Sequence, residues 1–319
     1  MPEPMIFSTR ASEYFARLIA EKLGISQLSE IERKTFGGGE KYYRIGIDDR
    51  SELMGRDVVF VASTHTDDDF LELYRVGCAL AKYGTKRRIF VIPFLGYSTM
   101  ERAIKSGEVV TAKTNTRAFS AIPNSGLGNV FLMMDLHVAS LAHFFEGDCQ
   151  PFELYANEVL IETMEKRGWC GDSSRTVFAS ADMGRTLWVQ SFAEHFGTSM
   201  ALVRKVRHGE TTRVAEVIGD VKGKRVIIYD DMLRSGGSLI NAAKAYANHG
   251  AFDIYVVISH CALDDQDVVK KICVTPCISR ILTTNSHPMS QCEAVKNSGR
   301  FIVADVSGVF AEAIKKIIV

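Results

Sequence analysis

Two adjacent carboxylates followed by a turn of small polar residues form the most chemically specific segment of the chain. Asp230 and Asp231 come directly after the apolar run 226–229. The turn after them contains Arg234, Ser235, Gly236, Gly237 and Ser238. Backbone N–H groups in such a turn, and at the start of a helix behind it, favour a phosphate. The carboxylates can accept hydrogen bonds from sugar hydroxyls or hold a metal ion through water. The segment therefore predicts a sugar-phosphate site.

The elements around this segment predict where in a fold it lies. Residues 226–229 are too short an apolar run for a helix and indicate a buried strand. Residues 239–249 are good helix sequence, which stops at Gly250. In open α/β sheets, ligands bind at the carboxyl ends of strands. Gly236 and Gly237 would let the backbone approach a ligand there, because neither carries a side chain.

Three more polar segments each lie at the end of a predicted strand. They are M-D-L-H at 134–137, S-A-D-M-G at 180–184 and R-K-V-R-H-G-E at 204–210. Lys205 and Arg207 alternate onto one face of a strand, where two cations would stabilise charge on a transferring diphosphoryl group. Structural interpretations stay open for each segment. His137 could be a hydrogen-bonding residue and Asp182 a helix cap, and the basic cluster could be a solvated loop.

Strands and helices alternate along the chain, which predicts an α/β fold of mostly parallel sheets flanked by helices. The predicted strands are 5–8, 57–63, 87–96, 129–137, 175–182, 199–207, 226–229, 252–261, 280–286 and 300–307. The pattern starts again after Pro151, which predicts two similar domains, 1–152 and 153–305. We expect the last helix, 306–319, to return to the first domain, because the two halves are otherwise unequal in length.

Composition narrows the class of protein. The 319 residues are 46% hydrophobic and 24% charged, as in an ordinary globular protein. Lys plus Arg and Asp plus Glu both number 38, so no overall field favours nucleic acid or a membrane surface. No apolar run reaches the length of a membrane span, and the N-terminus does not resemble a signal peptide. The seven cysteines lack a zinc-site pattern, which favours free thiols in the cytoplasm.

The segment 230–238 resembles the ribose-phosphate signature of type I phosphoribosyltransferases and ribose-phosphate diphosphokinases (PRPP synthetases). The usual form is D-D-x-x-x-T-G-G-T, so Ser235 and Ser238 keep the hydroxyls of two threonines. Arg234 is a departure, since the commoner synthetases carry Asp there. The M-D-L-H, S-A-D-M-G and K-V-R segments match further synthetase motifs in the same order. The resemblance extends from about residue 36 to residue 260.

This resemblance implies two phosphoribosyltransferase-like domains in a homo-oligomeric enzyme. The enzyme would transfer a diphosphoryl group from ATP, or another nucleoside triphosphate, to ribose 5-phosphate with Mg2+ as cofactor. Lys205 and Arg207 would be catalytic, and His137 and Asp182 would contact the metal. The ribose 5-phosphate site would be Asp230, Asp231, Arg234, Ser235, Gly236, Gly237 and Ser238. The nucleotide site would be Phe36, Gly38, Glu40, Thr99, Met100, Glu101 and Arg102.

The nucleotide segments depart from the commoner synthetase pattern. Gly38 replaces an acid or amide in F-x-[DN]-G-E, and Thr99 and Met100 replace an Arg-Gln pair. The stretch T-M-E-R at 99–102 looks closer to the plant-type (class II) synthetases. These departures leave open a non-catalytic, synthetase-like regulatory or binding subunit. A PRPP-using phosphoribosyltransferase is a second alternative, although it would leave the first half of the chain unexplained.

Overall fold

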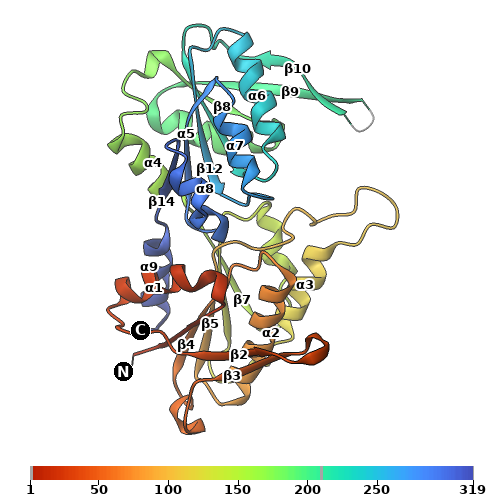
Figure 1. The fold of residues 1–319 in the computed structure, drawn as a ribbon, viewed down its shortest axis with the longest axis vertical. Helices are drawn as coiled ribbons and strands as arrows, with labels where there is room; N and C mark the ends of the chain where they lie inside the picture. The colour runs from red at the N-terminus through yellow and green to blue at the C-terminus, as the bar shows by residue number, and fades with distance from the viewer. Residues whose placement is uncertain (1–2, 209–210, 319) are drawn as a thin grey trace. The chain divides into compact units, whose positions relative to one another are not determined.

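The computed structural model describes residues 3–208 and 211–318, with the side chains of 205–215 outside the description. Contacts divide the chain into two compact units (Figure 1). Unit 1 consists of Met1–Tyr155 and Ser307–Val319, and unit 2 consists of Ala156–Val306. In the described part of the chain, no helix is long and apolar enough to span a membrane. All seven cysteines are free.

Unit 1 contains a parallel five-stranded sheet in the order β1-β4-β5-β6-β7. The strands are β1 (Met5–Ser8), β4 (Asp57–Val61), β5 (Arg87–Ile92), β6 (Asn129–Met134) and β7 (Gln150–Leu154). Every residue of β4, β5 and β6 is buried. Parallel strands covered on both faces appear in sequence as continuous apolar runs, which is why the pattern predicts these three strands well.

Four helices belong to unit 1 in the described residues. They are α1 (Glu13–Leu23), α2 (Asp67–Lys82), α3 (Thr111–Ser120) and α9 (Ser307–Ile318). Helix α9, the last in the chain, packs against α1, where the rings of Phe15 and Phe310 meet edge to face at 5.5 Å. Helix α2 begins after Thr66, whose Oγ1 accepts a hydrogen bond from the Asp69 N–H, and carries three acids in its first turn. Both features stabilise a helix N-terminus.

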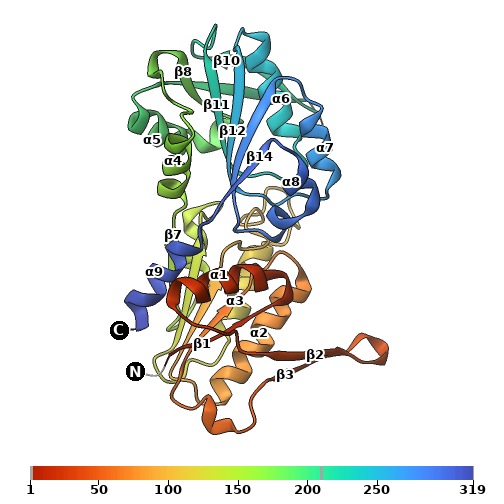
Figure 2. The ribbon, with the colours of Figure 1, turned by 60° about the vertical axis from the view of Figure 1, so that its left-hand side comes forward.

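A two-stranded hairpin, β2 (Ile31–Thr35) and β3 (Lys41–Ile45), projects from unit 1 (Figure 2). The sequence pattern does not predict it, because only Ile31 and Ile45 of its ten strand residues are buried. Arg33 anchors its base. The guanidinium contacts Glu72 of α2 at 2.6 Å and donates to the carbonyls of Ser8 and Ile31.

Unit 2 contains a seven-stranded sheet in the order β10-β9-β8-β11-β12-β13-β14. The strands are β8 (Thr176–Ser180), β9 (Ser199–His208), β10 (Thr211–Ile218), β11 (Arg225–Met232), β12 (Asp253–His260), β13 (Ile278–Thr284) and β14 (Phe301–Ala304). Among the described strands of this sheet, only β10 and β9 pair antiparallel. The helices are α4 (Asn157–Lys166), α5 (Thr186–Phe196), α6 (Gly237–Asn248), α7 (Asp267–Cys273) and α8 (Glu293–Asn297). The predicted class, mostly parallel sheets flanked by helices, is confirmed.

The central strand of unit 2 is longer than its sequence pattern indicates. The apolar run predicts 226–229, but β11 continues to Met232, which pairs with His260 of β12. Asp230 and Asp231 therefore lie within the last residues of the strand and not after it. Backbone pairing with β12 holds this polar end in the sheet.

Candidate active site

The turn between β11 and α6 has the backbone that a phosphate site requires. Gly236 has a φ of 76°, in the left-handed region, and an added Cβ would lie 3.3 Å from Val268. Helix α6 starts immediately afterwards at Gly237. Ser235, Gly237 and Ser238 are exposed. The first N–H groups of a helix have no partner within it, so this exposed terminus with its two serine hydroxyls suits an anion.

The two acids of β11 are part of a group of three carboxylates. Asp231 is 5% exposed and its N–H donates to Asp230 Oδ1 at 3.0 Å. Burial raises the pKa of Asp230 well above its usual value of 3.8, and the charges of Asp231 and Asp182 raise it further. Asp182 comes from the loop after β8, the strand that pairs with β11. Strand order thus gathers acids that are 48 positions apart in the sequence.

Arg185 enters the same group, although its sequence context does not reveal it. Its Nη2 lies 2.6 Å from Asp231 Oδ2, and the two side chains are 11% and 6% exposed. Arg185 ends a short 3₁₀ helix, Met183–Arg185, that follows β8. Only the adjacency of β8 and β11 explains the pairing, and a single sequence does not state which parallel strands are neighbours.

The acids of this edge fit a hydrated divalent cation. Asp182 Oδ1 accepts a hydrogen bond from the Gly184 N–H at 2.8 Å, so the capping role open for Asp182 is present. Among residues 3–208 and 211–318, no group of three or more His, Cys, Asp or Glu side chains is arranged to hold a bare metal ion. Mg2+ usually keeps several waters and uses one or two carboxylates. Burial, and then the charges of Asp231 and Asp182, raise the pKa of Asp230, and a cation bound there would favour its ionised form.

Lys205 and Arg207 lie on β9, opposite Val214 and Thr212 of β10. Alternate residues of a strand face the same side, so the two positions share a face of this edge ribbon. Their side chains lie outside the described residues, and their catalytic role stays a prediction. Arg234 is exposed, and its Nε lies 3.6 Å from Asp264 Oδ1, which is also exposed. An exposed pair of this kind contributes little energy.

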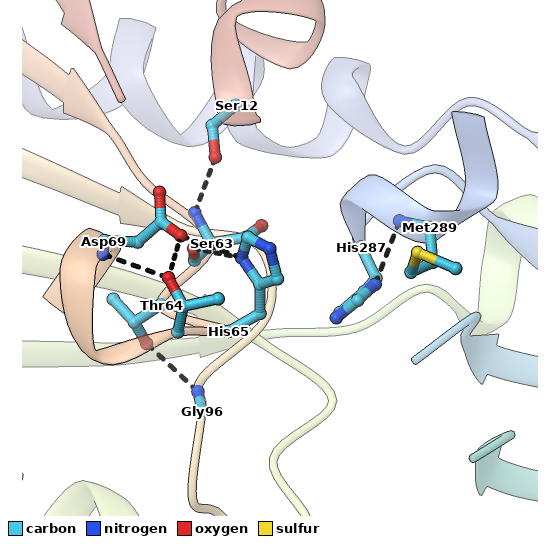
Figure 3. A network of polar contacts seen from close by, with 9 residues as sticks. Ser12, Ser63, Thr64, His65, Asp69, Gly96, His287 and Met289 are labelled. Carbon is cyan, nitrogen blue, oxygen red and sulfur yellow. Dashed lines mark hydrogen bonds and ion pairs between the residues drawn. The ribbon is translucent and has the colours of Figure 1, made fainter. Parts of the chain in front are cut away.

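A buried polar network borders the acids of β11. His260 Nδ1 lies 2.7 Å from Ser286 Oγ, and Thr284 Oγ1 donates to the Ser259 carbonyl at 2.7 Å. Tyr229 OH lies 3.1 Å from Ser259 Oγ. In the same unit, His287 Nδ1 accepts from the Met289 N–H (Figure 3). These bonds join the ends of β11, β12 and β13, and their satisfied polar groups stiffen the sheet edge that carries Asp230.

In unit 1, the loops after β4 and β5 are tied together at the carboxyl edge of the sheet. Figure 3 draws these contacts, which involve Ser12, Ser63, Thr64, His65, Asp69 and Gly96. The Gly96 N–H donates to Thr64 Oγ1 at 3.0 Å. A Cβ on Gly96 would lie 1.9 Å from the Thr64 carbonyl oxygen, so only glycine fits. His65 Nδ1 lies 3.2 Å from Asp69 Oδ2, which anchors the histidine to α2.

Backbone strain concentrates at this edge. Among the described residues, Tyr97 and Asp135 are the only non-glycine residues with positive φ, at 60° and 40°. Tyr97 comes shortly after β5 and Asp135 directly after β6. The Tyr97 hydroxyl donates to Asp67 of α2 at 2.5 Å. Strained backbone is retained mainly where function requires it, so both loops are candidate site segments.

Glu153 of β7 supports the M-D-L-H segment and is absent from the residues selected by sequence. Its Oε1 accepts from the Leu136 N–H at 2.9 Å, and its Oε2 accepts from the Tyr155 hydroxyl at 3.3 Å. Burial raises the pKa of Glu153, and the charge of Asp135 raises it further. His137 follows Leu136 and is half-buried.

The two nucleotide segments selected by sequence lie on different elements of unit 1, the hairpin and the loop after β5. Thr99, Met100 and Arg102 are exposed in the loop after β5, and Arg102 Nε lies 3.3 Å from Glu101 Oε1. Phe36 is 52% exposed beside the hairpin tip, where its ring contacts Tyr42 at 5.6 Å. The tip also carries the exposed Gly38 and Glu40. Figures 1 and 2 both show the hairpin projecting sideways from unit 1. Lys41, directly after Glu40, pairs with Asp68 of α2 at 3.2 Å.

The chain is similar to known proteins over nearly its whole length. Residues 4–122 match the N-terminal domain of ribose phosphate pyrophosphokinase, and residues 198–319 match the phosphoribosyl synthetase-associated domain. The ribose-phosphate pyrophosphokinases of Vibrio vulnificus and Haemophilus influenzae are each 30% identical over 322 residues, covering 99% of this chain and 96% of theirs. A phosphoribosylpyrophosphate synthetase structure from Mycobacterium smegmatis has a TM-score of 0.85, with 99% coverage of both chains and 22% identity. That structure shares the fold.

Proposed function

The chain belongs to the ribose-phosphate pyrophosphokinase family, and we propose that it transfers the β,γ-diphosphoryl group of a nucleoside triphosphate to ribose 5-phosphate, which produces PRPP. The observation that carries the proposal is the edge of unit 2, where acids at the end of β11 precede a glycine turn and a helix N-terminus. A sugar phosphate has both parts that this edge accommodates, hydroxyls and an anion.

The ribose 5-phosphate site lies entirely in unit 2 in this proposal. The 5-phosphate binds the backbone N–H groups and hydroxyls of residues 235–238, which are exposed except for Gly236. Asp230 and Asp231 accept hydrogen bonds from ribose hydroxyls. Arg234 lies beside the phosphate turn and adds a cation that is more than half exposed.

The transfer step needs positive charge close to the phosphates. A bond forms between the anomeric oxygen and the β-phosphorus, the bond from that phosphorus to the α,β-bridging oxygen breaks, and the nucleoside monophosphate leaves. The hydroxyl loses its proton during the step. Lys205 and Arg207 offset the negative charge that develops, which is the main need in phosphoryl transfer. Mg2+, when bound with the nucleotide, would neutralise phosphate charge. His137 in unit 1 and Asp182 in unit 2 are each a predicted metal contact.

The nucleotide side belongs to unit 1 in this proposal. The loop 94–102 and the M-D-L-H segment support it, since both follow strands at the strained carboxyl edge. Phe36, Gly38 and Glu40 complete the set. Because the hairpin projects its exposed tip from unit 1 (Figure 2), we also propose a homo-oligomer, in which the tip serves a second copy. Cytoplasmic location and membership of the class II branch are part of the proposal.

A product assay tests the proposal. The protein is incubated with ribose 5-phosphate, Mg2+ and ATP, GTP or CTP, and PRPP and nucleoside monophosphate are measured. Equal amounts of both products with at least one donor are expected, and omission of Mg2+ should abolish them. No product with any donor would favour a non-catalytic binding subunit. Consumption of added PRPP with a free base would instead favour a phosphoribosyltransferase.

A further inference from the structure

Arg185 forms the closest ion pair between two nearly buried side chains in the described part of unit 2. Its Nη2 lies 2.6 Å from Asp231 Oδ2, with 11% of the arginine side chain and 6% of the aspartate side chain exposed. The pair links the 3₁₀ helix after β8 to the end of β11. Sequence reasoning did not select Arg185, and the proposed transfer step does not use it.

The surroundings of the pair lie at the edge proposed for the sugar. Asp231 is adjacent to Asp230, and Asp182 is three residues before Arg185. Asp182 and Asp231 act electrostatically on Asp230, raising its pKa after the larger effect of burial. One guanidinium therefore lies among three acids at the edge proposed for ribose 5-phosphate.

We infer that Arg185 is a positioning residue that orients Asp231 toward the secondary hydroxyls of the pentose, and that it thereby makes the site selective for ribose 5-phosphate over its deoxy analogues. The inference rests on the proposed placement of ribose 5-phosphate in unit 2. With Oδ2 held 2.6 Å from Arg185 Nη2, rotation of the Asp231 carboxylate is restricted. A hydroxyl that donates to Asp231 must then approach from a defined direction.

Selectivity follows from the chemistry of a buried acceptor. A site built to accept a hydroxyl rejects an analogue that lacks it, because its own polar group is then left without that partner. Such rejection requires an acceptor that cannot turn elsewhere. Arginine suits this purpose, because its planar fork fixes a carboxylate more rigidly than the flexible ammonium of lysine does.

An inhibitory role for Arg185 would give different binding data. If Arg185 instead blocked the site by occupying Asp231, its removal would strengthen ribose 5-phosphate binding and leave the preference among sugars unchanged. A positioning role predicts weaker binding of ribose 5-phosphate and a smaller preference for it.

The test measures calorimetric binding of ribose 5-phosphate, 2-deoxyribose 5-phosphate and 3-deoxyribose 5-phosphate to the full chain without nucleotide. Wild type should prefer ribose 5-phosphate over at least one deoxy sugar by roughly tenfold to a hundredfold. This preference is the ratio of the two dissociation constants, deoxy sugar over ribose 5-phosphate. Arg185→Met should reduce the ratio at least tenfold, and Arg185→Lys should restore part of it. Wild type binding all three sugars equally, or none, would overturn the inference, as would an unchanged ratio in folded Arg185→Met.

Arg225→Met is the matched control, because Arg225 pairs with Asp253 at 3.4 Å at the other end of β11. Arg225→Met should lower the melting temperature without changing the ratio of sugar dissociation constants.

A double-mutant cycle is the second measurement. Once Asp231→Asn has removed the oriented acceptor, adding Arg185→Met should change the ratio no further. Additive effects of the two substitutions on the ratio would overturn the inference.

These outcomes separate the inference from the proposed function. A wild-type protein that binds ribose 5-phosphate selectively but makes no PRPP with any donor contradicts the proposed reaction alone. An enzyme that makes PRPP, and whose sugar ratio does not depend on Arg185, contradicts only the role of Arg185.

Discussion

Gly96 offers the sharpest test of the nucleotide side, because the structure leaves no room for one additional carbon. An ideal Cβ at this position would lie 1.9 Å from the Thr64 carbonyl oxygen, whereas real Cβ contacts essentially never fall below 3.0 Å. In Gly96→Ala the two loops must therefore separate by about 1.1 Å. The obstacle is a backbone atom, which cannot rotate away as a side chain would.

The hydrogen bonds of Thr64 pass this shift on to the loop 97–102. Thr64 is 2% exposed, its N–H donates to the Phe94 carbonyl at 3.0 Å, and its Oγ1 accepts from the Gly96 N–H. A misplacement of about 1 Å can reduce a rate about 100-fold, or about 2.7 kcal/mol. We therefore expect kcat/KM for the nucleotide to fall about 100-fold. Overpacking should also destabilise the fold by roughly 1–3 kcal/mol.

The assay varies the nucleotide at saturating ribose 5-phosphate, after thermal melting has established that the variant is folded. The Kd of ribose 5-phosphate should be unchanged, because its proposed residues all belong to unit 2. Gly171→Ala is the control, since its Cβ would meet only the Gly168 carbonyl at 3.8 Å, an ordinary contact. Thr64→Val removes the hydroxyl acceptor without the clash and should have a smaller effect. A folded Gly96→Ala enzyme with wild-type kcat/KM for the nucleotide would refute this reasoning.

Three further substitutions test other parts of the structure. Lys205→Ala should lower kcat roughly 100-fold or more while the melting temperature stays the same; unchanged turnover would sink the catalytic assignment. Because the pKa of Asp230 is raised in the fold, the native state binds this proton more tightly than the unfolded chain, so stability should fall as pH rises from about 3.8 through the raised pKa. Asp230→Asn should make stability depend less on pH and raise the melting temperature at pH 7 by a few degrees. PRPP formation should be lost. A lower melting temperature at pH 7 would contradict the inference that ionised Asp230 destabilises the fold. Arg88→Met should cost about 2–4 kcal/mol in urea unfolding, because Arg88 is 1% exposed and its removal takes away the donor to Asn129 Oδ1 and one of the two donors to the Ser125 carbonyl. Stability within 0.5 kcal/mol of wild type would exclude that cost.

Much of the fold could be predicted from the sequence, because the decisive signal is local. The buried strands β4, β5 and β6 appear as apolar runs, and the helices between strands have recognisable starts and stops. The hairpin β2–β3 gives no such signal, since tertiary contacts of Arg33 position its base. Hydrophobic patterning cannot detect an element that buries so few side chains.

The site residues likewise fall into those that the sequence predicts and those that it does not. Asp230, Asp231 and the turn after them could be predicted, because they are contiguous and follow a strand. Arg185 and Glu153 could not, since each acts on a residue of a neighbouring strand or loop: Arg185 on Asp231, and Glu153 on the Leu136 N–H. Contacts of this kind depend on strand order, which a single sequence does not state.

The two units give up stability at their candidate sites by different physical means. In unit 2, Asp230 is half-buried beside two other carboxylates, and Arg185 pairs with Asp231, one of those two. In unit 1, Tyr97 and Asp135 hold left-handed backbone that glycine would adopt without strain. Local rules are usually broken where function requires it. A surplus of negative charge suits a site that takes hydroxyls and a cation, whereas a strained but fixed backbone suits one that must orient a flexible triphosphate. The excess negative charge of unit 2 therefore agrees with ribose 5-phosphate as its substrate, and the strained backbone of unit 1 agrees with a nucleoside triphosphate.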